Sequence, residues 1–264
     1  MQQSNIKPLR SNDQLFHRHT VLEGAYNVRD VGGYPTSDGY ALKWGQLFRG
    51  DGLHRLTHAD RSILIGCNIC TVIDLRFSKE AEHALSQMMN VEGVRYEHIP
   101  LHDDPVAPAF SDQMNPARLP QTLDEYYYMV LDRCQKRFQT LFTLLTTPST
   151  FPCLYHSTAG KDRTGMLTML VLLALSVPRE IIVEDYMMTA EYAAPLLGKL
   201  NRQMLKEGID IEWHRRMLDC SPRSINRAID YLNQRHGGIA NYLRNIGVTE
   251  TQVKALRDEM ITTS

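Results

Sequence analysis

The stretch YHSTAGKDRTG, residues 155–165, concentrates side chains that bind anions. It follows the short apolar run FPCLYH and precedes a long one, MLTMLVLLAL, which predicts a strand, a tight loop and a helix. Backbone N–H groups converge at such a helix N-terminus, and the helix dipole adds positive potential. Gly160 permits unusual backbone conformations, Lys161 adds charge, and the planar fork of Arg163 can grip two phosphate oxygens. The composition therefore predicts a phosphate site.

Two common loop motifs do not fit this stretch. A nucleotide-binding P-loop needs GxxxxGK followed by Ser or Thr, but Tyr155 lies five residues before Gly160, and Asp162 follows Lys161. A hydrolase elbow needs GxSxG, and Ser157 has no glycine two residues to either side. Ser157 is the residue best placed to attack a bound group, yet it is an alcohol with no obvious base beside it, because no motif positions His156 to deprotonate it. The loop therefore belongs to another class of phosphate site.

The spacing of His156, Ser157 and Arg163 does match a known signature. With a cysteine at position 157 the string would be HCTAGKDRTG, which resembles the His-Cys-x5-Arg signature of the protein tyrosine phosphatase superfamily. More narrowly, it resembles the bacterial tyrosine/lipid phosphatases with an AGKDRTG loop. Further segments resemble that group in the same order: NVRDVGGY (27–34), LFRGDGLHRLT (47–57), VIDLRFSKE (72–80), VPRE…DYMMT (177–189) and YLNQRHGGIANYLRNIGVT (231–249).

This resemblance implies a phosphate monoester hydrolase that acts on phosphotyrosine through a phosphocysteine intermediate and uses no cofactor or metal. It extends the expected substrates to phosphoserine, phosphothreonine and phosphoinositides. Lys161 bears on the last of these, because phosphatases that accept inositol phospholipids also have a basic residue inside the loop. Position 157 is then the nucleophile position, and His156 and Thr164 support it. The residues expected to bind phosphate are Ser157, Thr158, Ala159, Gly160, Lys161, Asp162 and Arg163.

The acid that protonates the leaving oxygen has two candidate positions. Asp162 lies inside the loop, as in myotubularin-like phosphatases, whose loop also contains DRT. Asp103 and Asp104 lie on a polar loop after a strand. The best-known tyrosine phosphatases, which differ from the myotubularin-like ones, carry their general acid on such a separate loop. Asp162 is the favoured assignment, and its structural alternative is a carboxylate that pairs with Arg163 or Lys161.

Serine at position 157 predicts that the chain as printed binds phosphate without turning it over. An alcohol keeps the size and hydrogen bonding of a thiol but not its acidity, and such loops lower a thiol pKa from about 8.5 to roughly 3.5–7.5. Two explanations stay open: an engineered trapping variant of a native cysteine enzyme, and a natural pseudophosphatase that binds phosphorylated partners. The first is favoured because Arg163, Thr164 and the acid candidates are all present. A loop that binds an anion only for structure is the remaining alternative.

Strands alternating with helices predict an α/β fold, a cysteine-phosphatase-like, mainly parallel sheet flanked by helices, with a helix-rich C-terminal half. The expected strands lie in 69–76, 94–101 and 152–156, after a small hairpin unit at 27–50. The expected helices lie in 58–67, 123–147, 164–175 and after Pro178, with turns at Gly208 and Gly237. Parallel strands open onto one edge, so DLR (74–76) and HSTAGKDR (156–163) should meet there. Residues 191–218 are a candidate lid or packed scaffold.

Composition sets the remaining expectations. Residues 1–20 resemble a loose arm, and residues 21–264 a single phosphatase domain. The net charge of −1 predicts no nucleic-acid partner, and the clustered Arg215, Arg216, Arg223 and Arg227 are expected to form a solvated helix face. The longest apolar run is too short for a membrane span. Five scattered cysteines predict reduced thiols in the cytoplasm, with export by a route without a classical signal left open. The expected partners are phosphate and a phosphorylated protein or phosphoinositide.

Overall fold

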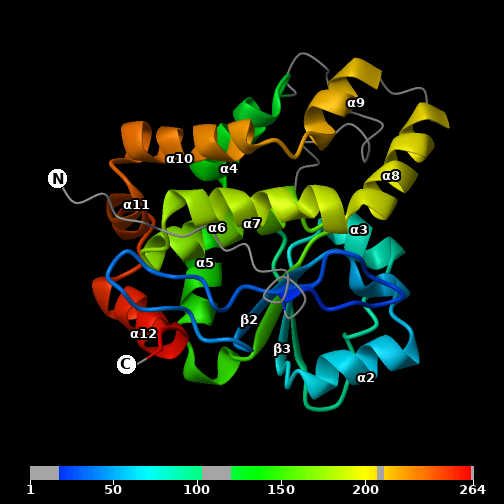
Figure 1. Cartoon of the computed structure of the whole chain (residues 1–264), viewed down its shortest axis with the longest axis horizontal. Coiled ribbons are helices and arrows are strands. Elements are labelled where there is room, and N and C mark those ends of the chain that lie inside the picture. Colours follow the sequence, from blue (N-terminus) through cyan, green and yellow to red (C-terminus); the bar gives the residue numbers. More distant parts are fainter. Residues whose placement is uncertain (1–17, 103–119, 207–210, 263–264) are drawn as a thin grey trace.

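A central five-stranded sheet organises the fold (Figure 1). The computed structural model describes residues 18–102, 120–206 and 211–262. The strand order is β1-β2-β5-β3-β4, with β1 antiparallel to β2 and the other neighbours parallel. This confirms the mainly parallel sheet and the small N-terminal hairpin. The strands are β1 (Arg29–Asp30), β2 (Leu47–Gly50), β3 (Thr71–Asp74), β4 (Arg95–His98) and β5 (Cys153–His156).

Helices and loops cover both faces of this sheet, because side chains alternate along each strand. Tyr155 of β5 faces the larger core, whereas the neighbouring Leu154 faces a smaller core that includes Leu64 of α2. A parallel sheet buried on both sides has this apolar pattern. The helices are α2 (His58–Gly66), α3 (Ser78–His83), α4 (Leu123–Arg133), α5 (Gln135–Leu145), α6 (Asp162–Ala174), α7 (Arg179–Tyr192), α8 (Ala194–Lys206), α9 (Ile211–Leu218), α10 (Pro222–His236), α11 (Ile239–Asn245) and α12 (Glu250–Met260).

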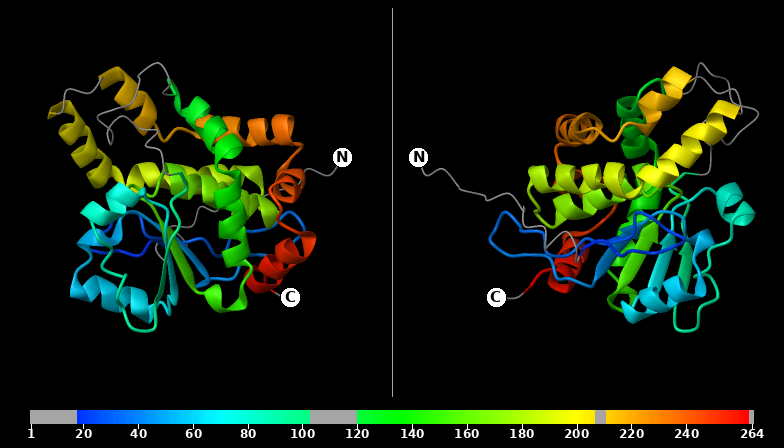
Figure 2. Two further views of the ribbon diagram at one scale, coloured as in Figure 1. Left: turned by 180° about the vertical axis from the view of Figure 1, so that it is seen from behind. Right: turned by 45° about the vertical axis from the view of Figure 1, so that its right-hand side comes forward.

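The single long helix expected over 123–147 is wrong: the chain breaks at Cys134 and forms α4 and α5. Cys134 has φ −96° and ψ 15°, outside the helical range. The two helices then diverge, as Figure 2 shows, so that α4 packs on α10 while α5 packs on α12. Apolar positions keep their helical spacing across the break, and the sequence pattern therefore does not reveal it.

The carboxyl ends of the parallel strands meet at one edge, as the sequence predicts. His156, the last residue of β5, pairs in register with Gly50 of β2 and Asp74 of β3. The chain then turns through residues 157–161 into α6, which is apolar on almost every side and buried in the larger core. Within the described residues, no helix combines the length and apolar composition needed to cross a membrane.

The C-terminal half is helical, as expected. Pro178 precedes α7 and Gly237, at φ +72°, ends α10 in the left-handed conformation that favours glycine. The candidate lid corresponds to α8 and α9, which extend away from the sheet (Figure 1). Gly208 lies outside the described residues, as does most of the expected N-terminal arm.

Candidate active site

The loop at residues 157–161 lies between the end of β5 and the start of α6. Ser157 is almost fully buried, and the Thr164 hydroxyl, one turn into α6, donates a hydrogen bond of 2.9 Å to its Oγ. Gly160 has φ +65°, which lets the loop curl back against β2. The first N–H groups of a helix have no partner within it. The loop can therefore present several N–H donors and the positive end of the α6 dipole to an anion.

Arg163 is held by Glu80, which lies at the start of α3. Its Nη1 and Nη2 donate to Oε2 and Oε1 of Glu80 at 2.5 and 3.1 Å. The Thr158 hydroxyl donates to the same carboxylate, and Phe77 stacks on the guanidinium at 4.4 Å. Burial acts to raise the pKa of Glu80, but the charge of Arg163 and the hydrogen bonds from Arg163, Thr158 and the Phe77 N–H together hold that pKa below its ordinary value. The pair therefore stays ionised and fixes the direction of the guanidinium.

Lys161 is a buried residue whose ammonium faces the α9–α10 connection. Nζ donates to the carbonyl oxygens of Met217 and Asp219 at 2.6 and 3.0 Å and lies 3.3 Å from Oδ1 of Asp162. These carbonyls belong to the C-terminal end of α9 and the residues after it, where a cation is favourable. Lys161 thus joins the loop to the candidate lid.

Asp162 begins α6, and its side chain is more exposed than those of its neighbours in the loop. Its Oδ1 accepts a hydrogen bond of 2.7 Å from the Tyr127 hydroxyl on α4. The other acid candidates, Asp103 and Asp104, lie outside the described residues. Of the three acid candidates, Asp162 is the one that lies within the described residues.

The back of the loop rests on polar side chains from the N-terminal hairpin. Asn27 Nδ2 donates to the carbonyl oxygens of Ala159 and Gly160 at 3.0 and 3.2 Å, and Arg49 Nη2 donates to that of Gly160 at 2.7 Å. Each contact turns a loop carbonyl away from the anion side. They direct the loop N–H groups toward the cradle.

A buried ion cluster anchors this support. Asp185 of α7 binds Arg49 and also accepts from Arg29 Nε at 3.1 Å. Burial acts to raise the pKa of Asp185, but the two guanidinium groups hold it well below its usual range. Asp30 instead accepts from the N–H groups of Gly32 and Gly45 at 2.7 and 2.6 Å. Arg29 and Asp30 thus make buried structural contacts that fix the N-terminal hairpin and α7.

His156 is fully buried behind the loop. Its Nε2 lies 3.8 Å from Oδ2 of Asp74, which in turn binds Arg76 Nη2 and the Tyr96 hydroxyl at 2.6 Å each. Burial lowers the pKa of His156 to about 4. The imidazole is therefore neutral at physiological pH. Asp74 and Arg76, the charged residues of the DLR strand exit, are almost entirely buried at the end of β3.

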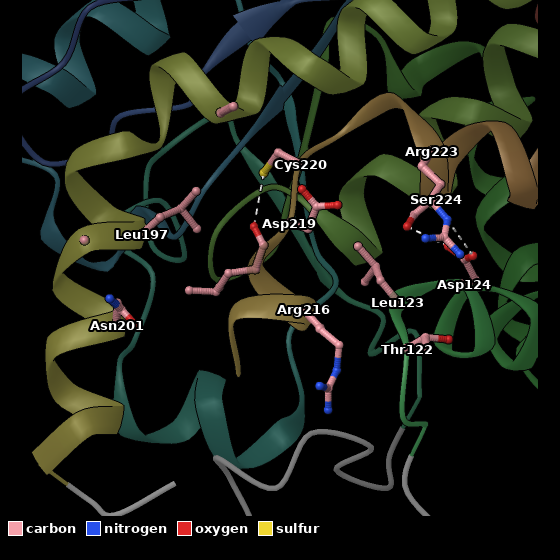
Figure 3. Close-up of a pocket in the computed structure, with 13 residues that line it drawn as sticks. Thr122, Leu123, Asp124, Leu197, Asn201, Arg216, Asp219, Cys220, Arg223 and Ser224 are labelled. Atoms are coloured by element: carbon pink, nitrogen blue, oxygen red, sulfur yellow. Dashed lines mark hydrogen bonds and ion pairs between the residues drawn. The ribbon is translucent and has the colours of Figure 1, made fainter. Parts of the chain in front are cut away.

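A pocket of about 670 Å³ lies between α4, α7, α8, α9 and α10 (Figure 3). Asp219 joins it to the loop, because its carbonyl accepts from Lys161. Arg223 and Arg227 are exposed on α10, as expected for a solvated face, with Nε atoms 3.6 and 3.8 Å from Asp124. The lining residues are Thr122, Leu123, Asp124, Ala190, Leu197, Gly198, Asn201, Arg216, Leu218, Asp219, Cys220, Arg223 and Ser224.

Sequence reasoning assigned no role to Glu80, Tyr127 or Arg49, which contact residues 158–163, or to Asp185, which binds Arg49. Glu80 is the last residue of VIDLRFSKE, a segment that resembles the family, but the sequence did not predict that it pairs with Arg163. Tyr127 lies in a run of three tyrosines, of which it alone is fully buried. Asp185 carries no local signal, because its partners Arg29 and Arg49 are more than a hundred residues away in sequence.

The chain is similar in sequence to a known protein family and to several of its members. The profile of a family described as "Tyrosine phosphatase family" matches residues 20–262. "Triple specificity protein phosphatase PtpB" of Mycobacterium tuberculosis is 28% identical over 278 residues, covering 91% of this chain and 98% of the relative. A "Tyrosine-protein phosphatase" of Nostoc commune is 26% identical over 259 residues, covering 96% and 85%. The similarity thus extends over nearly the whole chain.

Proposed function

The chain belongs to the tyrosine phosphatase family, and we propose that residues 157–163 form a phosphoryl-transfer site for phosphate monoesters, with phosphotyrosine as the main substrate. The observation that carries the proposal is the junction of β5 and α6. There, position 157 lies under the N-terminus of α6, and Arg163 is oriented by two hydrogen bonds from its guanidinium to Glu80. A loop of this kind stabilises negative charge on transferring phosphoryl oxygens.

In the form with cysteine at position 157, the cycle has two steps. The thiolate attacks phosphorus and the P–O bond to the leaving group breaks, giving a phosphocysteine. Water then attacks the same phosphorus, the S–P bond breaks, and phosphate leaves. The Thr164 hydroxyl, which donates to the position-157 side chain, stabilises the thiolate as it departs. Arg163 and the loop N–H groups hold the equatorial oxygens throughout.

Asp162 is the proposed acid. It gives its proton to the leaving oxygen in the first step and takes one from the attacking water in the second. Its position at the start of α6 and its partial exposure support this assignment. Asp103 and Asp104 remain the alternative acids.

Serine at position 157 changes the outcome. His156 lies behind the loop, is neutral and has a pKa of about 4, so it is a poor base for an alcohol. We therefore propose that the chain as printed holds phosphorylated ligands without turnover, as a trapping variant of a cysteine enzyme. A natural pseudophosphatase is the second candidate, and the intact Glu80–Arg163 pair suits both.

The substrate range is proposed to be broad. PtpB carries "triple specificity" in its name, which supports extension of the activity to phosphoserine, phosphothreonine and phosphoinositides. In this chain Lys161 contacts the α9–α10 connection. We propose that phosphoinositide binding through Lys161 requires α9 to move, with α8 and α9 acting as a lid over the pocket.

The deciding experiment is Ser157→Cys. The purified variant is assayed for phosphate release from phosphotyrosine peptides, phosphoserine peptides and phosphoinositides, beside the printed chain and Ser157→Ala. Turnover by the cysteine form alone supports the phosphatase. A silent cysteine form that still binds phosphopeptide supports the pseudophosphatase, and loss of both activity and phosphate binding contradicts the site itself.

A further inference from the structure

Two buried tyrosine hydroxyl groups form a short chain behind Asp162. Tyr127 of α4 is fully buried, and Tyr186 of α7 is 1% exposed. The Tyr127 hydroxyl lies 2.7 Å from Oδ1 of Asp162 and 2.7 Å from the Tyr186 hydroxyl. Their rings meet edge to face, with centroids 6.3 Å apart. A buried polar chain of this kind needs every donor and acceptor matched.

The direction of the hydrogen bonds follows from counting protons. A phenol has one proton to donate, and a carboxylate can only accept, so Tyr127 donates to Asp162. Tyr186 must then donate to Tyr127, because the other acceptor near it, the Asp219 carbonyl, lies farther away at 3.4 Å. Burial raises the pKa of both tyrosines well above the ordinary value. Both hydroxyls therefore stay protonated at any working pH.

We propose that Tyr127, supported by Tyr186, is a positioning residue for Asp162 as the general acid. The proposal rests on the phosphatase function proposed above. Tyr127 holds Oδ1, which leaves Oδ2 to carry the transferred proton. When that proton passes to the leaving oxygen, the carboxylate that remains is stabilised by the Tyr127 hydroxyl and by Lys161, whose Nζ lies 3.3 Å from Oδ1.

This arrangement gives α4 and α7 a part in the chemistry, although neither helix contributes a residue to the loop. The alternative is that the two hydroxyl groups only satisfy each other inside the core. In that case their removal destabilises the protein but affects all substrates alike. A general acid matters more when the leaving group is a weaker acid, and this dependence separates the two roles.

The first test measures kcat/KM, which reports the step in which the leaving group departs, for aryl phosphates whose phenols range from strongly acidic to tyrosine-like, in the Ser157→Cys background. Asp162→Asn sets the reference dependence on the leaving group. Tyr127→Phe should lose about tenfold on the tyrosine-like substrate, the scale of one hydrogen bond to a charged group, and less than about twofold on the most acidic phenol. Tyr186→Phe should show a smaller loss of the same form.

Tyr242→Phe is the matched control, because its buried hydroxyl donates to the Leu131 carbonyl away from the loop. The dependence of its kcat/KM on the leaving group should match that of the parent. An equal loss on all phenols for Tyr127→Phe, or no loss, overturns the positioning role while the phosphatase stands. A Ser157→Cys form that releases no phosphate from any aryl ester overturns the proposed function and the role together.

The second test needs no turnover and uses the chain as printed. Hydroxyl protons this buried exchange slowly enough to be sought by proton NMR. The Tyr127 hydroxyl resonance, assigned through Tyr127→Phe, should move in Asp162→Asn, while that of Tyr242 should not. An unchanged Tyr127 resonance contradicts the hydrogen bond on which the proposal depends. Inorganic phosphate should bind Tyr127→Phe and the parent within about twofold, because binding needs no proton transfer.

Discussion

The carboxylate of Glu80 accepts two hydrogen bonds from the guanidinium of Arg163, at 2.5 and 3.1 Å. The two residues are 83 positions apart in sequence, and both are largely buried. The contact connects α3, at the end of β3, with α6, at the end of β5. A neighbouring strand exit therefore helps to set the plane of the Arg163 guanidinium, together with Thr158 of the loop, whose hydroxyl oxygen accepts from Nη2 at 3.2 Å.

Glu80→Gln in the Ser157→Cys background should lower kcat/KM about tenfold to a hundredfold. Loss of one preorganised donor costs about a hundredfold or more, and this substitution leaves the Arg163 donor present but poorly aligned. Steady-state kinetics on a phosphotyrosine peptide measure the effect. Glu97→Gln is the matched control, since Glu97 pairs with Arg95 at 2.6 Å on the exposed edge strand β4. A Glu80 variant that behaves like the Glu97 variant contradicts the orienting role.

Asp185→Asn should lower the free energy of unfolding by about 3–5 kcal/mol, because it leaves the charges of Arg29 and Arg49 buried without a partner. Urea denaturation measures the change. Asp230→Asn removes an ion pair with Arg179 of 2.6 Å on the surface of α10 and should cost about 0–1 kcal/mol. Equal costs for the two variants would contradict the larger contribution to stability expected of the buried ion cluster.

The sequence predicted the loop and its surroundings where the determinants are local. A strand, a tight turn and a helix N-terminus follow one another within residues 153–174, and the parallel strand ends meet at one edge because the sheet topology requires it. The partners of the loop could not be predicted in the same way. From the sequence we expected Lys161 to contact substrate. Its ammonium instead donates to the carbonyl oxygens of Met217 and Asp219, 56 and 58 residues later, which only tertiary packing brings near.

The break at Cys134 has a similar cause. Apolar side chains repeat at helical spacing on both sides of it, so the pattern over 123–147 is that of one helix. The division places α4 against α10 and lets Tyr127 reach Asp162, while α5 packs on α12. A non-helical ψ at Cys134 alone is enough to redirect the chain. The cysteine side chain does not predict this break.

Gly160→Ala should abolish detectable phosphate binding to the printed chain. A Cβ at this position would lie 2.5 Å from the Gly50 carbonyl oxygen and 2.8 Å from Asn27 Nδ2, in addition to the cost of φ +65°. Gly93→Ala isolates the backbone cost, because its φ is +79° and nothing lies within 4 Å of the added atom; about 1–2 kcal/mol of stability is expected there. Calorimetric titration with phosphate, beside denaturation, compares them. Retained binding in the Gly160 variant contradicts the close approach of loop and β2.

His156→Leu should change how stability depends on pH. Burial lowers the pKa of His156 from 6.5 to about 4, so between these values the unfolded chain takes up a proton that the folded chain does not. The free energy of unfolding of the parent therefore falls as the pH is lowered through this range, by about 3 kcal/mol at most. The leucine variant lacks this loss.

The measurement is the difference between the free energies of unfolding of the two chains, from urea denaturation at several pH values from 7 to 4. That difference should move by about 3 kcal/mol in favour of the leucine variant as the pH falls. Asp51, whose pKa burial raises to about 6, titrates in the same range with the opposite sign, but it is present in both chains and cancels. A difference that stays constant with pH would mean that His156 takes up a proton as readily in the folded chain as in the unfolded chain. That result would contradict the lowered pKa of the buried imidazole.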